Sequence, residues 1–380
     1  MRITRVRAEN LRSLKQIDLE LRPFTVVIGP NGAGKSSFLE LVNLFAGAEE
    51  PANLINGLSR WGGYHATLRF GAGNATMKIG VTLSDDENKF DYDIELMGEG
   101  GHCFVRSENL SRTAQKQRAR QDLLRREDAN EHVYTKDGQF IQQRTNHGPS
   151  TDLGRLRVTI PDVEPVLSVL KRITLWPVHK FQPSDRVRGP QQLQPTKMPA
   201  LDGSNLFSSL YAMKTEQRHS YNQLLESLRA AVPELEDLEF PLAGAGHVNM
   251  TWTQRNFDRP FYSNQLSDGT LRLLWLVTVL YTVPDDGLVL LDEPELSLHP
   301  QWLMLLVSIL RKTSARTNVL VATQSAEFIR WVQPEELVIA DMTEDGATFS
   351  RVNDRADLAQ WLEDFTLAQL WTMGELGGRR

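Results

Sequence analysis

A glycine-rich segment near the N-terminus has the residue types and spacing that bind a chain of phosphates. Residues 29–36 read Gly-Pro-Asn-Gly-Ala-Gly-Lys-Ser and fit the pattern G-x-x-x-x-G-K-[ST]. The glycines let backbone N–H groups turn toward phosphate oxygens, Lys35 adds a positive charge at the β- and γ-phosphates, and the Ser36 hydroxyl can ligate Mg²⁺. We therefore expect a site for ATP and Mg²⁺. Its candidate residues are Asn31, Gly32, Ala33, Gly34, Lys35, Ser36 and Ser37.

Two adjacent acids supply the second part of such a site. Asp292 and Glu293 directly follow the apolar run Leu288–Leu291. At the carboxyl end of a central strand, Asp292 can hold the metal and Glu293 can polarise an attacking water. By itself the pair also fits an acidic turn after an ordinary strand. The glycine-rich segment gives the catalytic interpretation its weight.

Two polar segments at element ends complete the candidate residues. Ser267 and Gly269 stand just before an apolar helical pattern, where a hydroxyl and free N–H groups can bind phosphate. The simpler interpretation of Ser267 is a helix N-cap. Gln324 follows the buried run 319–323 and could hydrogen-bond a γ-phosphate or the attacking water. The simpler interpretation of Gln324 is an ordinary loop amide.

The elements that must position these residues come from both ends of the chain. We expect strands at 3–9, 17–21 and 24–28, a helix at 35–46, and an antiparallel sheet over 64–106. After residue 247 the pattern returns, with strands at 247–253, 288–291 and 318–323, helices at 270–281 and 300–314, and a hairpin at 337–352. Both ends therefore build one α/β core.

The middle of the chain reads as an insertion into this core. Residues 107–155 are polar and rich in Arg and Gln, and we expect mobile helix and loop there. Residues 162–172 and 203–232 have helical patterns. We divide the chain into an N-terminal ATPase lobe (1–106), a helical and irregular basic insertion (107–240) and a C-terminal ATPase lobe (241–380).

The order of these motifs resembles the RecF/SMC-like branch of the ABC-type ATPases, which includes the ATPase domain of OLD-family nucleases. The similarity lies in Glu9–Leu14, in Leu266–Thr270, and in the run Leu-Asp-Glu-Pro-Glu-Leu-Ser-Leu-His-Pro at 291–300. The resemblance implies an α/β fold: an ABC-type P-loop ATPase head with a mixed-sheet core, an N-terminal antiparallel β subdomain and an α-helical insertion.

The resemblance also implies a mechanism. Two protomers would hold two ATP molecules head to tail, with Ser267 and Gly269 of one protomer contacting the γ-phosphate at Lys35 of the other. Glu293 would be the general base and Asp292 the Mg²⁺ partner. Arg12 matches an Asn-x-Arg motif and would lie near the nucleotide. ATP would close the homodimer and hydrolysis would open it, which would signal to DNA or to a separate effector, a nuclease or toxin, in DNA repair or phage defence.

The sequence departs from the family pattern in two places. Gln324 stands where the family usually has His, and a Gln side chain cannot accept and return a proton. It can still orient a water molecule, so we expect slow hydrolysis. The second departure is in residues 58–65, which occupy the Q-loop region without a Gln.

Charge and composition bound the partners and the compartment. The formal net charge is −6, but residues 101–190 hold 16 Lys and Arg against 10 Asp and Glu. This basic region could contact DNA backbone, or it could be a solvated surface. Cys103 is the single cysteine, which favours a reducing cytoplasm. No apolar run approaches the roughly 20 residues that a membrane span needs.

Two other functions fit part of the pattern. An ABC transporter nucleotide-binding subunit would share the phosphate site, although the Asn-Leu-Arg-Ser-Leu stretch at 10–14 and the long insertion fit a RecF-like protein better. A non-hydrolysing scaffold that uses ATP as structural glue is favoured by Gln324 and disfavoured by Glu293. The 55 residues after Ser325 leave no room for a nuclease domain, so we expect effector chemistry from another polypeptide.

Overall fold

The structure is a computed structural model of the 380-residue chain. It describes residues 1–47, 53–73, 76–99, 102–115, 120–127, 130–134, 139–145, 151, 153–157, 160–177, 181, 185–354 and 358–377.

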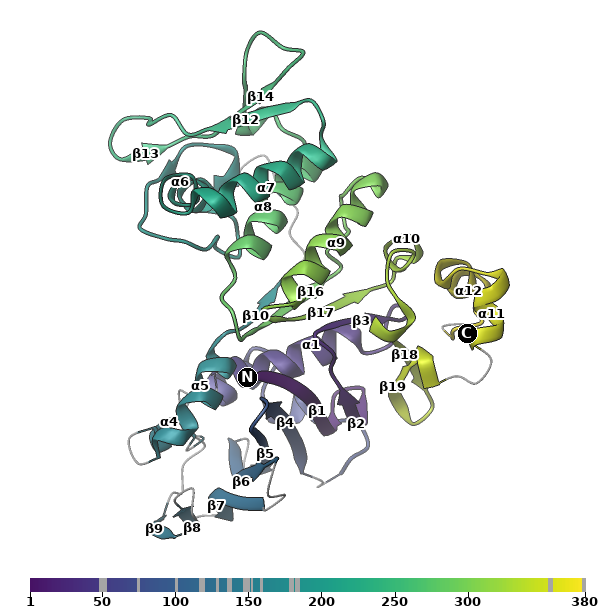
Figure 1. Ribbon diagram of the computed structural model, residues 1–380. Coiled ribbons are helices and arrows are strands. Elements are labelled where there is room, and N and C mark those ends of the chain that lie inside the picture. Colours follow the sequence, from purple (N-terminus) through teal and green to yellow (C-terminus); the bar gives the residue numbers. More distant parts are fainter. Residues whose placement is uncertain are drawn as a thin grey trace.

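A six-stranded mixed sheet forms the centre of the molecule (Figure 1). In sheet order its strands are β10 (Ile173–Trp176), β16 (Leu288–Asp292), β17 (Asn318–Thr323), β3 (Phe24–Ile28), β18 (Leu337–Thr343) and β19 (Gly346–Arg351). The first five are parallel, and β19 closes an antiparallel hairpin with β18. The predicted strands 24–28 and 318–323 are confirmed to the residue. The mixed α/β core is confirmed as well.

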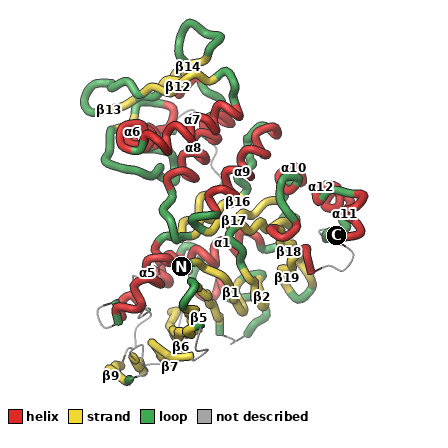
Figure 2. Tube along the Cα trace, in the orientation of Figure 1, coloured by secondary structure: helices red, strands yellow, loops and turns green. Residues whose placement is uncertain are grey.

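Helices cover both faces of this sheet. Along β3, Val27 faces the core that contains α1 (Lys35–Leu44), while Val26 and Ile28 face the core that contains α8 (Asp268–Thr282) and α9 (Leu303–Ser314). Figure 2 shows the two layers, with α8 and α9 above the strands and α1 below them. Burial on both faces explains why the central strands read as continuous apolar runs.

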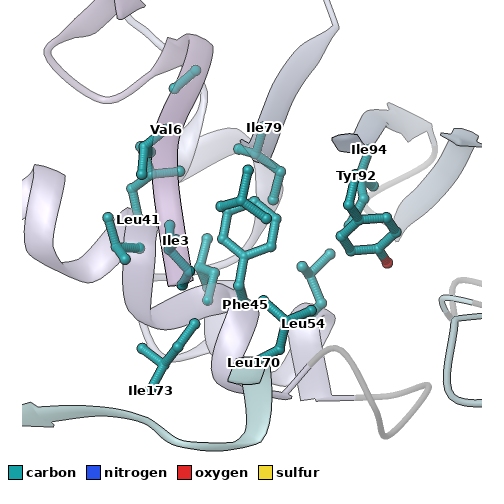
Figure 3. Packing of buried hydrophobic residues seen from close by; sticks show 14 of the residues in the cluster. Ile3, Val6, Leu41, Phe45, Leu54, Ile79, Tyr92, Ile94, Leu170 and Ile173 are labelled. Atoms are coloured by element: carbon teal, nitrogen blue, oxygen red, sulfur yellow. The ribbon is translucent and has the colours of Figure 1, made fainter. Parts of the chain in front are cut away.

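An eight-stranded antiparallel sheet packs beneath α1. Its strands, in sheet order, are β2 (Leu14–Glu20), β1 (Arg2–Leu11), β4 (Met77–Ser84), β5 (Asn88–Glu99), β6 (His102–Ala114), β7 (Arg120–Glu127), β8 (Asn130–Tyr134) and β9 (Phe140–Thr145). Figure 3 shows the shared core, where Phe45 at the end of α1 packs between Ile3 and Ile79, with Tyr92 of β5 nearby. The predicted N-terminal antiparallel subdomain is therefore present.

One expectation about the middle of the chain is wrong. We expected mobile helix and loop over 107–155, but β6 to β9 continue the antiparallel sheet through much of that range. β6 also runs across residue 106 without a break. The division of the chain at 106 and 240 into separate lobes stays a prediction.

The predicted helical part of the insertion begins later. It consists of α5 (Glu164–Lys171), α6 (Leu206–Glu216) and α7 (Arg218–Ala231). Helices α6 and α7 pack beside α8 in the upper lobe of Figure 1. Two small sheets lie in the same lobe. One pairs β11 (Gln191–Gln192) with β13 (His247–Val248), and the other contains β12 (Leu235–Glu239), β14 (Thr251–Gln254) and β15 (Phe261–Tyr262).

Short helices make up the rest of the described chain. The α-helices are α2 (Asn53–Ser59), α3 (Tyr64–Thr67), α4 (Leu153–Leu156), α10 (Ala326–Ile329), α11 (Leu358–Asp364) and α12 (Leu367–Met373). The 3₁₀ turns are Phe45–Gly47, Pro161–Val163, Arg186–Arg188, Ser263–Gln265, Pro300–Trp302, Pro334–Glu336 and Val352–Asp354. Across the described ranges, no helix is both long enough and apolar enough to span a bilayer.

Candidate functional site

The glycine-rich segment forms the turn between β3 and α1. Gly34 is the N-cap of α1 and has φ 87°, and Gly32 has φ 82°, a backbone region that favours glycine. Gly29 is needed for a different reason, because a Cβ there would lie 2.3 Å from the carbonyl oxygen of Ala340. The loop is thus held against β18 and leads into a helix N-terminus, an arrangement that binds anions through backbone N–H groups.

Lys35 lies inside this turn and is 6% exposed. Its ammonium donates hydrogen bonds to the carbonyl oxygens of Gly29, at 2.7 Å, and Pro30, at 3.0 Å. Burial lowers the pKa of Lys35, while the nearby carboxyl groups of Glu293 and Asp292 act in the opposite direction. The Lys35 ammonium is therefore held inside the loop, close to the carboxyl groups of Glu293 and Asp292.

Ser36 and Asp292 meet although they come from distant parts of the chain. The Ser36 hydroxyl donates a 2.9 Å hydrogen bond to Oδ2 of Asp292. Burial raises the pKa of Asp292, and the bond from Ser36 and the charge of Lys35 partly offset that effect. A hydroxyl and a carboxylate oxygen at this distance are hard oxygen donors, the type that Mg²⁺ prefers. The donor set therefore fits Mg²⁺.

Glu293 is fixed by its backbone. It has φ 43°, which is uncommon for a residue with a side chain. Its N–H donates to the carbonyl oxygen of Ala322 at 2.8 Å, and its carbonyl accepts from Nη2 of the buried Arg272 at 3.1 Å. Both bonds hold the turn after β16, so the Glu293 carboxyl is presented beside Lys35 and Asp292.

The signature segment is positioned by different contacts. Ser267 is the N-cap of α8, because its Oγ accepts a 3.1 Å hydrogen bond from the N–H of Thr270. The simpler interpretation of Ser267 is therefore present in the structure, and the exposed hydroxyl can also face a ligand. Gly269 packs so closely on the following loop that a Cβ would lie 2.5 Å from the carbonyl oxygen of Ser297.

Arg188 anchors the same segment from the insertion. Its guanidinium donates to the carbonyl oxygen of Leu266 at 2.9 Å and to the carboxylate of Asp268. From the sequence, Arg188 was only one of the basic residues in the middle region. In the structure it pairs with Asp268. The signature residues belong to the α8 layer, on the opposite face of the central sheet from α1.

Gln324 leaves the end of β17 with its side chain exposed, and Ser325 caps the short helix that follows. Sequence reasoning missed the neighbouring acid Glu295. Its carboxyl accepts a hydrogen bond from the Thr323 hydroxyl, and burial raises its pKa to about 7. The run Asp-Glu-Pro-Glu at 292–295 contains Glu295, but nothing in that pattern predicts its burial.

Arg12 lies beside the helix that follows the phosphate-binding turn. Its guanidinium pairs with Glu40 of α1 and stacks on the ring of Trp61, 4.3 Å from the centroid. Trp61 belongs to the region where we found no Q-loop Gln. Contact between Arg12 and the nucleotide stays a prediction.

The structure therefore brings Lys35, Ser36, Asp292 and Glu293 together at the carboxyl edge of the central sheet. Residues 24–330 match the family model described as "AAA domain, putative AbiEii toxin, Type IV TA system". The chain belongs to this family.

Curated relatives and solved structures agree with that assignment. An OLD nuclease of Thermus scotoductus is 31% identical over 114 residues, which cover 26% of this chain and 21% of the relative. The DNA replication and repair protein RecF of Acinetobacter baylyi is 49% identical over 47 residues, 12% of this chain and 13% of the relative. The matched segments thus span about a fifth or less of the curated relatives' length.

The fold is that of SMC head domains. A crystal structure of the SmcHead bound to the C-winged helix domain of ScpA matches with TM-score 0.56 at 12% identity, covering 92% of this chain and 97% of that one. An Smc head domain from Pyrococcus furiosus matches with TM-score 0.53 at 10% identity, covering 96% and 100%. The chain is thus an ABC-type ATPase of the RecF/SMC-like class, as its motifs predicted.

Proposed function

We propose that this protein binds Mg-ATP and hydrolyses it to ADP and phosphate as a molecular switch. The observation that carries the proposal is the 2.9 Å hydrogen bond between Ser36 and Asp292, with Lys35 and Glu293 beside it. Phosphate donors, metal ligands and a carboxylate base are all required for hydrolysis, and these residues supply them at one sheet edge.

The chain's own residues would divide the work as follows. The backbone N–H groups of residues 31–36 and the Lys35 ammonium hold the phosphate chain. Bound Mg²⁺, held by Ser36 and Asp292, would offset the negative charge that develops on the phosphates. Glu293 accepts a proton from the attacking water. Gln324 orients that water but cannot take its proton, so we expect slow turnover.

We further propose that ATP closes a head-to-tail homodimer. Ser267 is exposed at the start of α8, where its hydroxyl can reach a phosphate bound to a second copy of the chain. The signature residues at the start of α8 and the phosphate loop before α1 belong to layers on opposite faces of the central sheet. If the partner completes the site, the protein would be a dimer when ATP is bound and a monomer after hydrolysis.

A separate effector, a nuclease or toxin, is the second part of this proposal. The family description mentions a toxin, and one relative is named a nuclease. Among the described residues, no group of three or more His, Cys, Asp or Glu side chains is arranged to hold a metal ion. A setting in DNA repair or phage defence, in the cytoplasm, completes the proposal, and the name of the RecF relative, a DNA replication and repair protein, supports its first part.

The basic middle region offers a smaller DNA surface than its charge suggests. Arg126 is 1% exposed, so it cannot touch a duplex. Arg120 is exposed, and Arg125 is exposed but pairs with Glu127 at 2.6 Å. Other basic residues of that region, Lys116, Arg118 and Lys180, lie outside the described residues. DNA contact is therefore a proposal that rests on β7 and on the exposed Lys171.

An ATP turnover assay tests the central proposal. Wild-type protein should hydrolyse ATP in the presence of Mg²⁺, and Lys35→Ala should reduce the rate to background. Lys15→Ala is the matched control, because Lys15 is an exposed lysine whose ion pair with Asp345 lies outside the phosphate-binding turn. If wild type turns over no more ATP than Lys35→Ala, hydrolysis is refuted, and retained ATP binding would then favour the scaffold alternative.

A transporter subunit remains the other alternative. It would be favoured by co-purification of the intact protein with membranes, and a homodimer that forms in solution on ATP addition would count against it.

A further inference from the structure

We propose that Glu295 is a positioning residue for hydrolysis, which holds the turn that presents Gln324 to the attacking water. The inference rests on the proposed ATPase function and assigns a task to a buried carboxyl that the mechanism above does not use. It acts through Thr323 and does not itself touch the nucleotide.

The first step is the contact between two loops at the carboxyl edge of the sheet. Glu295 lies in the turn after β16, and Thr323 is the last residue of β17. The Thr323 hydroxyl donates a hydrogen bond to Oε1 of Glu295. The same hydroxyl accepts a 2.9 Å hydrogen bond from the N–H of Ser325. This second bond closes a turn from Thr323 to Ser325, and Gln324 is the residue enclosed in it.

The Thr323 hydroxyl has a single proton, and this determines how it connects its two partners. Thr323 has one O–H to donate and two lone pairs to accept. When Glu295 takes the proton, a lone pair is directed toward Ser325 and the tight turn around Gln324 closes. Without an acceptor at Glu295 the hydroxyl can rotate, and the turn loses its fixed orientation. Thr323 itself is completely buried, so its hydroxyl has no water to turn to.

The third step is the environment of Glu295. Its Oε2 atom is buried and makes no hydrogen bond within the described part of the chain. A buried polar atom without a partner costs free energy that an apolar side chain would avoid. Burial also raises the pKa of Glu295 to about 7. A carboxyl kept under these conditions is explained if its other oxygen is needed at Thr323.

Two further bonds make the link rigid. The N–H of Leu298 donates to the carbonyl oxygen of Glu295 at 3.0 Å, and the N–H of Glu293 donates to the carbonyl oxygen of Ala322 at 2.8 Å. The turn after β16 is therefore joined to the end of β17 through backbone at Glu293 and through a side chain at Glu295. The base and the water-orienting amide are held as one unit.

The decisive experiment measures kcat and KM for ATP in the full-length protein. Glu295→Ala and Thr323→Val should each lower kcat by about tenfold or more, with KM changed by less than about threefold, because phosphate binding is made elsewhere. Glu295→Gln keeps an acceptor for Thr323 and should stay within about threefold of wild type. Glu344→Ala is the control, since Glu344 is exposed in the β18–β19 turn.

A double-mutant comparison tests whether Glu295 acts through Gln324. If Glu295 works by orienting Gln324, then adding Glu295→Ala to a Gln324→Ala background should lower kcat by no more than about twofold. Independent, multiplicative losses would overturn the inference, and so would a Glu295→Ala protein with wild-type kcat. If Glu295→Ala fails to fold, Thr323→Val carries the same test without removing a charge.

Hydrogen exchange provides a readout that does not depend on hydrolysis. The Ser325 amide should exchange faster in Glu295→Ala than in wild type or Glu344→Ala, while the β3 amides stay unchanged. Unchanged protection of Ser325 would refute the inference even if ATP is turned over. If wild type lacks activity above Lys35→Ala, the proposed function has failed, and the exchange result still decides the contact.

Discussion

The Ser36 hydroxyl donates to Oδ2 of Asp292 across 2.9 Å of space and 256 residues of sequence. One residue opens the helix after the glycine-rich turn, and the other ends β16. In the central sheet β17 lies between β3 and β16, so the two side chains meet across the end of the intervening strand. The two halves of the chain thus supply the two side chains that we propose as Mg²⁺ ligands.

Breaking this pair should weaken Mg²⁺-dependent hydrolysis. We expect Asp292→Asn to lower kcat by about 100-fold, since a neutral amide is a weaker ligand for a hard dication than a carboxylate. Titration of Mg²⁺ at saturating ATP measures the effect. Asp86→Asn, at an exposed turn before β5, is the matched control and should titrate like wild type. Equal Mg²⁺ curves for both variants would contradict the assignment.

Glu293→Gln should separate ATP binding from hydrolysis. Removing the base should slow turnover by about 10²- to 10⁴-fold while the phosphate contacts remain. We therefore expect this variant to accumulate as an ATP-bound dimer, seen by light scattering with Mg-ATP. Lys35→Ala is the opposite control and should stay monomeric. Monomers of Glu293→Gln at saturating Mg-ATP would remove the sandwich arrangement.

Gly269→Ala should damage the signature segment through backbone contact alone. The added Cβ would meet the carbonyl oxygen of Ser297 at 2.5 Å, and that backbone atom cannot move aside as a flexible side chain could. Since Ser297 itself has φ 65°, the loop has little freedom to adjust. We expect ATP-dependent dimerisation to be lost while nucleotide binding by the monomer persists. Equilibrium binding of a fluorescent ATP analogue, measured beside light scattering, distinguishes these effects. Gly189→Ala is the control, because Gly189 has φ −135° and its added Cβ would meet no atom within 4 Å.

The inner strands of the central sheet were predictable because they are buried on both faces, whereas the edge strand β10 was not predicted. β3 and β17 are mainly apolar, are buried at every residue and stop before Gly29 and Gln324, so sequence alone located the carboxyl edge and the residues that leave it. The metal-ligand roles of Ser36 and Asp292 stay predictions that rest on residue type and position.

The strands over 107–145 were missed because charged residues occupy inward positions. Glu108 and Arg126 lie opposite each other in the β6–β7 register and are both almost completely buried. A register shift between Leu110 and Ser111 further interrupts the alternation on β6. The alternation of apolar and polar residues therefore did not reveal these strands, because polar side chains occupy part of their buried face. Glu295 was missed for the same reason, because burial of an acid depends on the tertiary fold.

Glu295→Gln should change how stability depends on pH. Burial raises the pKa of Glu295 from its ordinary 4.5 to about 7. Between these values the folded protein keeps a proton that the unfolded chain releases, so this group makes wild type less stable as pH rises. The variant lacks this loss, and its stability relative to wild type should increase by at most about 3 kcal/mol from pH 4.5 to pH 7. Urea unfolding at pH 5 and pH 8 measures the difference. A constant difference, like that expected for exposed Glu344→Gln, would contradict the assignment.

The two kinds of arginine on β7 should behave differently toward DNA. Arg120→Ala should weaken duplex binding and reduce the salt slope by about 1, as expected for loss of one phosphate contact. Arg126→Ala should leave the salt slope unchanged and instead lower the free energy of unfolding by about 3 kcal/mol, because it removes a buried charge opposite Glu108. Fluorescence anisotropy over a salt series and urea unfolding separate the two effects. A reduced slope in Arg126→Ala would mean that this side chain reaches the duplex.

The placement of β3 also sets the order of events on the ribosome. Its neighbours β17 and β18 are made long afterwards, with about 290 residues between Ile28 and Asn318. At about 5 to 20 residues per second, synthesis of that stretch takes roughly 15 to 60 s. Through this interval the glycine-rich turn has no adjacent strand on either side. A nascent chain therefore completes the sheet around this turn only after β17 and β18 emerge, and a translation product interrupted before them lacks that support.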